Sequence, residues 1–200
     1  MTATFCSVVD LEQFLQIKIS SAAAIDAADR AILEASAVIQ NYCRQQIEQE
    51  ENDEVTLDSA GGTRLFLPEL PVTAVSPVIE DGETLVEGDD YQLGQHGILH
   101  RIGQNWDIGI QIVMITYTHG YELIPDDVVA ICTRAAARAY QAGLKAAETE
   151  GVPGVTAMGL GDYSVSYGGE AGGGTGGVLG GSAAPVLLRS EKELLNRYRL

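Results

Sequence analysis

The sequence has few of the residues that usually carry catalysis or cross-links. Its 200 residues include three histidines and three cysteines. The cysteines, Cys6, Cys43 and Cys132, are odd in number, have no paired spacing, and lie in or beside predicted helices. Buried, reduced thiols are the usual explanation for such a pattern, and they fit a reducing cytoplasm.

Long hydrophobic runs are also missing. No stretch approaches the ~18 consecutive apolar residues of a membrane-spanning helix, and the N-terminus has no basic region followed by an apolar run. We therefore expect neither a signal peptide nor a membrane span. The hydrophobic content of 46% is nonetheless enough for one compact domain with appendages.

Basic residues are scarce. Lys and Arg number 12 against 28 Asp and Glu, which gives a net charge of −16 and makes strong binding to the DNA backbone unfavourable. The last twelve residues reverse the sign, with Arg189, Lys192, Arg197 and Arg199 against Glu191 and Glu193. This reversal predicts a basic C-terminal tip on an acidic protein, suited to an acidic groove on a partner or on a sister subunit.

The histidines, glycines and acidic turns do not form a catalytic or metal-binding motif. His96 and His100 are separated by strand-like residues and cannot share a helical face as a zinc pair would. His119 has no evident nucleophile or carboxylate partner, so we predict a structural role for it. Residues 159–161 lack the Gly-Lys-Ser/Thr of a phosphate loop, and residues 80–90 lack the ligand order of a calcium loop. The sequence indicates no catalytic, cofactor-binding or metal-binding residue.

One short helix and two long helices are predicted from apolar spacing and start signals. Asp10 can cap a helix over about 10–17, and Ser20 or Ser21 can start a helix over about 21–47. The seam of the second helix alternates large and small residues at Ile25, Ala28, Ile32, Ala35, Ile39 and Tyr42. We interpret this seam as core packing within the monomer, with a subunit contact as the alternative.

The third helix is predicted over 126–147. Pro125 can occupy its first turn, and Arg134, Arg138, Gln141 and Lys145 are expected on its solvated face.

Residues 54–118 show short β runs separated by turn residues. Residues 54–57 and 64–67 flank a glycine turn and predict one hairpin, and Val72–Glu80 leads into a second at Asp81-Gly82. Further strands are expected at 91–93, 98–102 and 110–118. Together they predict a small, mostly antiparallel β subdomain inserted between the helices.

The last third of the chain turns into a glycine-rich arm. A short strand at 162–167 precedes residues 168–184, which are rich in Gly, Ala and Ser. Alternation puts Tyr163, Val165 and Tyr167 on one face, where they could add to a sheet edge of their own subunit or of a neighbour. An arm of this length spans roughly 20–25 Å when flexible, enough to reach an adjacent subunit.

A short helix is predicted at the C-terminus. Ser190 can cap it, Glu193 can complete a capping box, and Leu194, Leu195 and Tyr198 fall on one face. Such a short helix is marginal alone in water and is expected to gain its order by docking.

These elements predict an α+β fold with a long-helix bundle core, an inserted small antiparallel β subdomain, and a Gly-rich C-terminal arm ending in a short helix. Residues 1–167 are expected to form a single domain, 168–184 the arm, and 185–200 the docking segment.

Taken in order, the segments of this chain resemble the head-tail connector, or adaptor, proteins of tailed bacteriophages. The resemblance spans nearly the whole chain and is carried by residues 10–15, 39–43, 71–75, 88–91, 115–121, 124–127, 162–167 and 195–199. It implies a structural virion protein of the neck, assembled in the host cytoplasm, with no catalysis and no cofactor.

The resemblance further implies a ring, usually twelvefold, beneath the portal of the DNA-filled head. Such a ring offers a platform to the next neck or tail protein, and DNA passes through without sequence-specific binding. The C-terminal residues expected to meet the portal, or else a neighbouring subunit, are Leu187, Leu188, Arg189, Leu194, Leu195, Arg197, Tyr198 and Arg199.

Two alternatives stay open at this point. A stopper or tail terminator would share the acidic, β-containing, oligomeric character, although the long helices and the basic terminal helix favour the adaptor. A small hydrolase would need a convergent set of His, Cys or carboxylate groups that the spacing does not supply.

Overall fold

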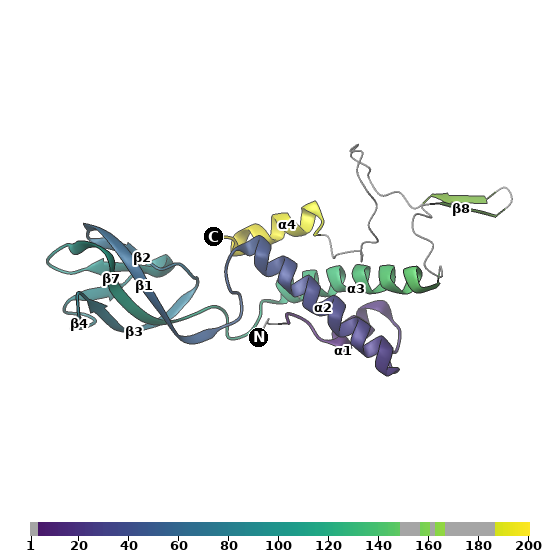
Figure 1. Cartoon of the computed structure of the whole chain (residues 1–200), viewed down its shortest axis with the longest axis horizontal. Helices are drawn as coiled ribbons and strands as arrows, with labels where there is room; N and C mark the ends of the chain where they lie inside the picture. The colour runs from purple at the N-terminus through teal and green to yellow at the C-terminus, as the bar shows by residue number, and fades with distance from the viewer. Residues whose placement is uncertain (1–3, 149–156, 161–162, 167–186) are drawn as a thin grey trace.

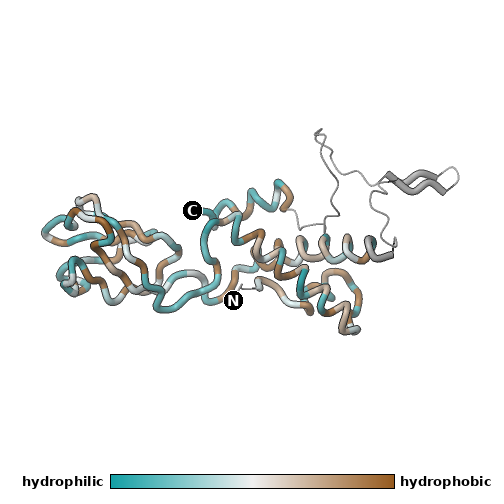
Figure 2. The backbone as a smooth tube through the Cα atoms, in the orientation of Figure 1, coloured by the Kyte–Doolittle hydropathy of each residue, from teal (hydrophilic) through white to brown (hydrophobic). Residues whose placement is uncertain are grey.

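The structure is a computed structural model that describes residues 4–148, 157–160, 163–166 and 187–200. Within these residues the fold is α+β, with four α-helices and antiparallel sheets. Figure 1 shows the β strands β1–β7 gathered at one end and helices α1–α4 at the other. Figure 2 shows hydrophobic segments in both parts and a hydrophilic stretch in the chain that joins α2 to the strands.

Helices α1 and α2 begin at serine caps. In α1 (Val8–Leu15) the N-cap is Ser7, and Asp10 closes the capping box, so the prediction that Asp10 is the cap was wrong. Ser7 and Asp10 both offer a side-chain oxygen that can accept a backbone N–H, so the sequence alone does not say which of them is the N-cap. Helix α2 (Ala22–Cys43) begins after Ser21 as predicted. It ends before residue 47 because Arg44 adopts a left-handed conformation.

Helix α3 (Asp126–Glu148) packs on α1 and α2. Small residues at the contact, among them Ala28, Ala35 and Ala135, are fully buried and allow the helices to approach closely. The predicted α2 seam is largely confirmed by the burial of Ile32 and Ile39. Ile25, near the start of the helix, is instead 37% exposed.

The main sheet has the order β1-β7-β3-β4 with all neighbours antiparallel. Its strands are β1 (Glu50–Gly62), β3 (Val72–Glu80), β4 (Glu83–Leu85) and β7 (Trp106–His119). The hairpin predicted at Asp81-Gly82 is confirmed, because Glu80 pairs with Glu83 across that turn.

A second, three-stranded sheet has the order β2-β6-β5. It contains β2 (Arg64–Phe66), β5 (Tyr91–Leu93) and β6 (Ile98–Arg101), and the 3₁₀ turn η1 (Gln95–Gly97) joins β5 to β6. The hairpin predicted between residues 54–57 and 64–67 was wrong, since β1 pairs with β7 and β2 pairs with β6. The glycines at 61 and 62 belong to the end of β1, where Gly62 pairs with Trp106, and residue 63 links β1 to β2 in the other sheet.

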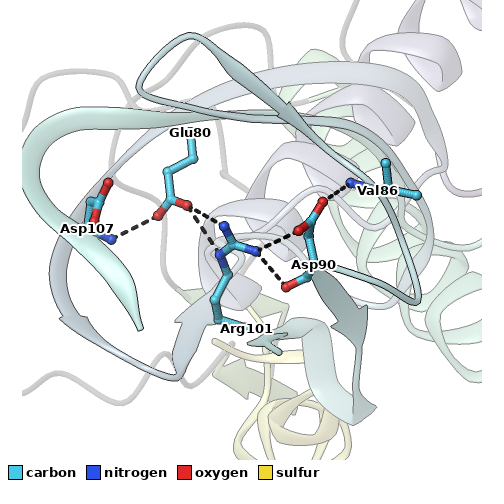
Figure 3. A network of polar contacts seen from close by, with 5 residues as sticks. All are labelled: Glu80, Val86, Asp90, Arg101 and Asp107. Carbon is cyan, nitrogen blue, oxygen red and sulfur yellow. Dashed lines mark hydrogen bonds and ion pairs between the residues drawn. The ribbon is translucent and has the colours of Figure 1, made fainter. Parts of the chain in front are cut away.

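A buried ionic network ties the two sheets together. Arg101 of β6 contacts Glu80 of β3, with Nη2–Oε2 at 3.1 Å, and both side chains are about 95% buried. Glu80 also accepts a hydrogen bond from the backbone N of Asp107, and Arg101 donates to the carbonyl of Asp90. Figure 3 shows the guanidinium held between Glu80 and Asp90. Nothing in the local sequence pattern predicts this network, because its members lie on separate strands.

The β part and the helical part meet where two chain segments cross. Tyr121 donates its N–H to the carbonyl of Ile47 at 2.8 Å, and Gln49 donates to the carbonyl of Tyr121 at 3.1 Å. Gly120 has φ +85°, and a Cβ there would lie 2.4 Å from the carbonyl oxygen of Glu48. Only glycine fits this crossing without a shift of the backbone.

The last described elements are the hairpin of β8 (Ala157–Leu160) and β9 (Tyr163–Ser166), helix α4 (Arg189–Leu195) and the 3₁₀ turn η2 (Asn196–Tyr198). The predicted glycine-rich arm, 168–184, lies outside the described residues.

Candidate functional site

The C-terminal segment, residues 187–200, docks on helices α2 and α3 of its own chain. Leu187, Leu195 and Tyr198 are at most 7% exposed and belong to the same hydrophobic cluster as the core faces of α1, α2 and α3. The segment thus docks on its own subunit, whereas the portal, or else a neighbouring subunit, was expected to receive it. The prediction that Leu194 shares the buried face was wrong, since it is 49% exposed. Figure 1 shows α4 lying beside α2, with the C-terminus directed toward the β part.

The first polar anchor of the segment joins α3 to α4. Arg138 donates Nη1 to Oε1 and Nη2 to Oε2 of Glu191, at 2.9 and 2.7 Å. Glu191 is 2% exposed and also accepts the backbone N–H of Leu188 at 2.9 Å. A carboxylate this deeply buried needs such partners, and the two-point contact with a guanidinium also fixes its direction.

Two predictions about these residues were wrong. Ser190 does not cap α4; Leu188 occupies the N-cap position, and Glu191 binds its N–H from the third helical position. Arg138 is not on a purely solvated face, because it lies half-buried against Glu191. Helical periodicity depends only on residues close in sequence. It therefore cannot predict an ion pair between residues that are 53 positions apart.

The second polar anchor lies at the N-terminus of α3. Asp127 accepts the Tyr198 hydroxyl at Oδ1, 2.7 Å away, and Arg197 Nη1 at Oδ2, 2.9 Å away. Burial opposes the charge of Asp127, but the bonds from Tyr198 and Arg197 outweigh it and lower the pKa of that carboxyl. Burial, together with the same bond, raises the pKa of Tyr198 to about 12.

The third anchor covers the C-terminal end of α2. Tyr42 donates its hydroxyl to Oδ1 of Asn196 at 2.7 Å, and the guanidinium of Arg199 lies 5.5 Å from the centre of the Tyr42 ring. Gln45 donates its side-chain amide to the carbonyl of Tyr198, and Leu200 donates its N–H to the carbonyl of Cys43 at 3.1 Å. The bond from Leu200 satisfies the carbonyl of Cys43, one of the backbone groups that the end of α2 leaves open.

The docked segment also has an outer face. Leu188 is 50% exposed, Leu194 is 49% exposed, and the side chain of Arg189 is 95% exposed. We call Leu188, Arg189 and Leu194 the outer face. The predicted partner-binding set is thus divided: Leu187, Leu195 and Tyr198 face the subunit's own core, Arg197 and Arg199 hold anchors, and the outer face points to solvent. Binding of a partner stays a prediction.

The remaining predicted residues are those of the strand near residue 165 and His119. Tyr163 and Val165 lie in β9, which pairs with β8, whereas Tyr167 lies outside the described residues. His119 is buried, with Nε2 at 3.4 Å from Oδ2 of Asp53 and its ring 4.8 Å from that of Tyr117. The expectation that His119 has no carboxylate near it was therefore wrong, because Asp53 is distant from it in sequence but lies on the adjacent strand. A contribution of Tyr163, Val165 and Tyr167 to assembly stays a prediction.

The described residues contain neither a metal-binding cluster nor a helix suited to cross a membrane. No group of three or more His, Cys, Asp or Glu side chains there could hold a metal ion. Of the helices that the structure describes, none combines the length and apolar character that a membrane crossing requires.

The fold is similar to that of neck proteins of phage-like particles. A chain from the neck of a native GTA particle computed with C12 symmetry aligns with a TM-score of 0.50 and 16% identity, covering 96% of this chain and 87% of that one. A chain from the neck of an empty GTA particle computed with C6 symmetry aligns with a TM-score of 0.51 and 17% identity, covering 96% and 88%. At these identities the comparison shows a shared fold.

A comparison at the level of sequence families identifies the chain more directly. No curated protein matches it. A family model described as head completion protein matches residues 4–134, which include α1, α2, all seven strands β1–β7 and the first part of α3. The match covers more than half of the chain, and so the chain belongs to the head completion protein family.

Proposed function

We propose that this chain is a ring-forming subunit of the neck of a phage-like particle, where it joins the DNA-filled head to the tail. Membership of the head completion family is the observation that carries this proposal. The similarity of the fold to two neck chains supports it, and the C12 symmetry of one of those necks makes a twelvefold ring the natural arrangement to test. The proposed role contains no catalytic step.

In this proposal helices α1–α3 form the body of the subunit, and residues 168–184 link it to the docked C-terminal segment. The outer face of that segment, Leu188, Arg189 and Leu194, then meets the portal, with a neighbouring subunit as the alternative. Two leucines about half exposed beside a cation suit a partner groove that is apolar with an acidic rim. The next neck or tail protein would bind elsewhere on the ring.

The net charge of −16 supports the passage of DNA through such a ring. DNA phosphates are repelled by an acidic wall, so the double helix can slide past without adhering.

The test measures attachment to portal-bearing heads that lack this chain. The variant Leu188→Ser/Leu194→Ser removes the apolar part of the outer face, and serine at the N-cap position preserves the start of α4. We expect at least a tenfold loss of co-sedimentation with heads, while the thermal unfolding midpoint changes little. Leu33→Ser, at a leucine of α2 that is 46% exposed, is the matched control and should bind normally.

Truncation after Ala184 is a less specific experiment. It would remove the outer face, but it would also remove Leu187, Leu195 and Tyr198 from the hydrophobic core. Normal attachment by the double serine variant would overturn the assignment of the outer face. A protein that forms no ring and ignores portals would overturn the neck function itself.

A further inference from the structure

Two of the three cysteines lie side by side in the helical core. The Sγ atoms of Cys6 and Cys132 are 3.3 Å apart, although 126 positions separate the residues in sequence. Both thiols are free and buried. We propose that Cys6 and Cys132 form a cross-linking site, which is reduced in the cell and closes to a disulfide when the protein meets an oxidising small-molecule disulfide. This inference does not depend on the proposed function.

The surroundings hold both sulfur atoms in place. Cys132 lies inside α3, and its Sγ is 3.4 Å from the Ser36 hydroxyl of α2. The N-terminal segment is fixed by the same hydroxyl, which accepts the backbone N–H of Phe5 at 3.0 Å. Phe5 itself is 3% exposed. The approach of the two sulfurs is therefore built into the packing of three segments.

Closing the bond needs only a small movement. The sulfur atoms must approach by about 1.3 Å to reach the S–S length of a disulfide. Cys132 is held in a helix, but Cys6 precedes α1 in a short non-helical segment whose N-cap is Ser7. Side-chain rotation with a slight shift of this segment can supply the movement. Cys43 has no such neighbour among the described cysteines.

The exchange proceeds in two balanced steps with oxidised glutathione as the probe. The Cys6 thiolate, belonging to the more exposed thiol of the pair, attacks one glutathione sulfur and releases one glutathione thiolate. The Cys132 thiolate then attacks Sγ of Cys6, forms the protein disulfide and releases the second glutathione. Two cysteine thiols are oxidised, one glutathione disulfide is reduced, and the two thiol protons end on the two glutathione molecules.

The cross-link would join the N-terminal segment to the middle of α3. It would close a loop of more than half the chain, which restricts the unfolded state. Outside a reducing compartment such a bond persists. We therefore expect the oxidised protein to unfold about 5–10 °C higher than the reduced protein.

The experiment incubates the full chain with oxidised glutathione, alkylates free thiols in denaturant, and measures the intact mass and the linked peptides. The wild type should lose two hydrogens, carry one alkyl group, on Cys43, and show a Cys6–Cys132 peptide. Its raised unfolding midpoint should return to the original value when a reductant is added.

Matched variants identify the pair. Cys43→Ser should keep the cross-link, whereas Cys6→Ser and Cys132→Ser should each lose it. Three alkylated cysteines after oxidation, glutathione retained on Cys6, or a cross-link that includes Cys43 would each overturn the assignment. The wild-type result decides the matter even if one variant fails to fold.

Discussion

Arg101 illustrates how a single residue can hold two sheets together. Its guanidinium contacts Glu80, the carbonyl of Asp90 and the face of Trp106, and its side chain is 4% exposed. A charge in this position is tolerated because each of its partners is fixed by the surrounding strands. Removing one partner of such a pair leaves the other charge buried without compensation.

We predict that Arg101→Met destabilises the protein by about 3–5 kcal/mol. The reason is the carboxylate of Glu80, which would stay buried with only the N–H of Asp107 as a donor. Urea unfolding followed by the fluorescence of Trp106 measures this loss. Arg64→Met, at an exposed position of β2, is the matched control and should change the free energy of unfolding by less than about 0.5 kcal/mol.

The phenol of Tyr198 should make the stability of the protein depend on pH. Its pKa is raised from 10 to about 12, so the folded protein holds this proton more tightly than the unfolded chain. The associated stability is fully present below pH 10 and is lost as the pH rises through about 12. The stability advantage of the wild type over Tyr198→Phe should therefore shrink between these two values in urea unfolding. An advantage that stays constant across that range would contradict the role of the phenolic proton.

At the scale of elements, helix α4 depends on its docking face. Leu195 is fully buried, whereas its neighbour Leu194 is 49% exposed. We predict that Leu195→Ala costs about 2–5 kcal/mol of local stability and increases hydrogen exchange in α4. Leu194→Ala should leave the exchange close to that of the wild type. Equal exchange in the two variants would show that α4 is not held by this face.

The β elements show which pairings can be predicted from sequence. The hairpin at Asp81-Gly82 was predicted correctly because its strands are adjacent in the chain and the turn residues mark it. The glycines at 61 and 62 carry an equally clear turn signal, but β1 pairs instead with β7, which begins 44 residues after β1 ends (106 − 62). Local turn chemistry marks where the chain bends and does not specify the strand that completes the sheet.

The candidate site also has a part that the sequence predicts and a part that it does not. The amphipathic pattern of residues 187–200 predicted a docking helix and placed Leu194, Leu195 and Tyr198 on its buried face. Leu195 and Tyr198 are buried, but Leu194 is half exposed. It could not identify the receiving surface, because Arg138, Asp127 and Tyr42 come from distant parts of the chain. Each of these residues has an ordinary local explanation in the sequence, as a solvated cation, a helix start or a seam residue.

At the scale of the whole molecule, the charge dominates the expected behaviour toward DNA. With a net charge of −16, we predict that the protein binds duplex DNA with a Kd weaker than about 10⁻⁴ M at physiological salt. Fluorescence anisotropy with a labelled duplex measures this. The absence of binding should persist when the salt concentration is lowered, since weaker screening also strengthens the repulsion. Binding that tightens at low salt would indicate a basic surface and contradict an acidic channel wall.

The sequence by itself determined the α+β composition, the three main helices, the β insertion, the acidic character and the resemblance to head-tail connectors. The composition, the helices, the β insertion and the acidic character follow from local periodicity, turn residues and charge counts, which do not depend on the path of the chain. The resemblance is carried by the order of the segments along the chain. Only the tertiary structure decided that the C-terminal segment docks on its own subunit, that Arg101 joins two sheets, and that Cys6 lies against Cys132. Each of these contacts joins residues that are distant in sequence, and their energy comes from burial and hydrogen bonding that exist only after the chain has folded.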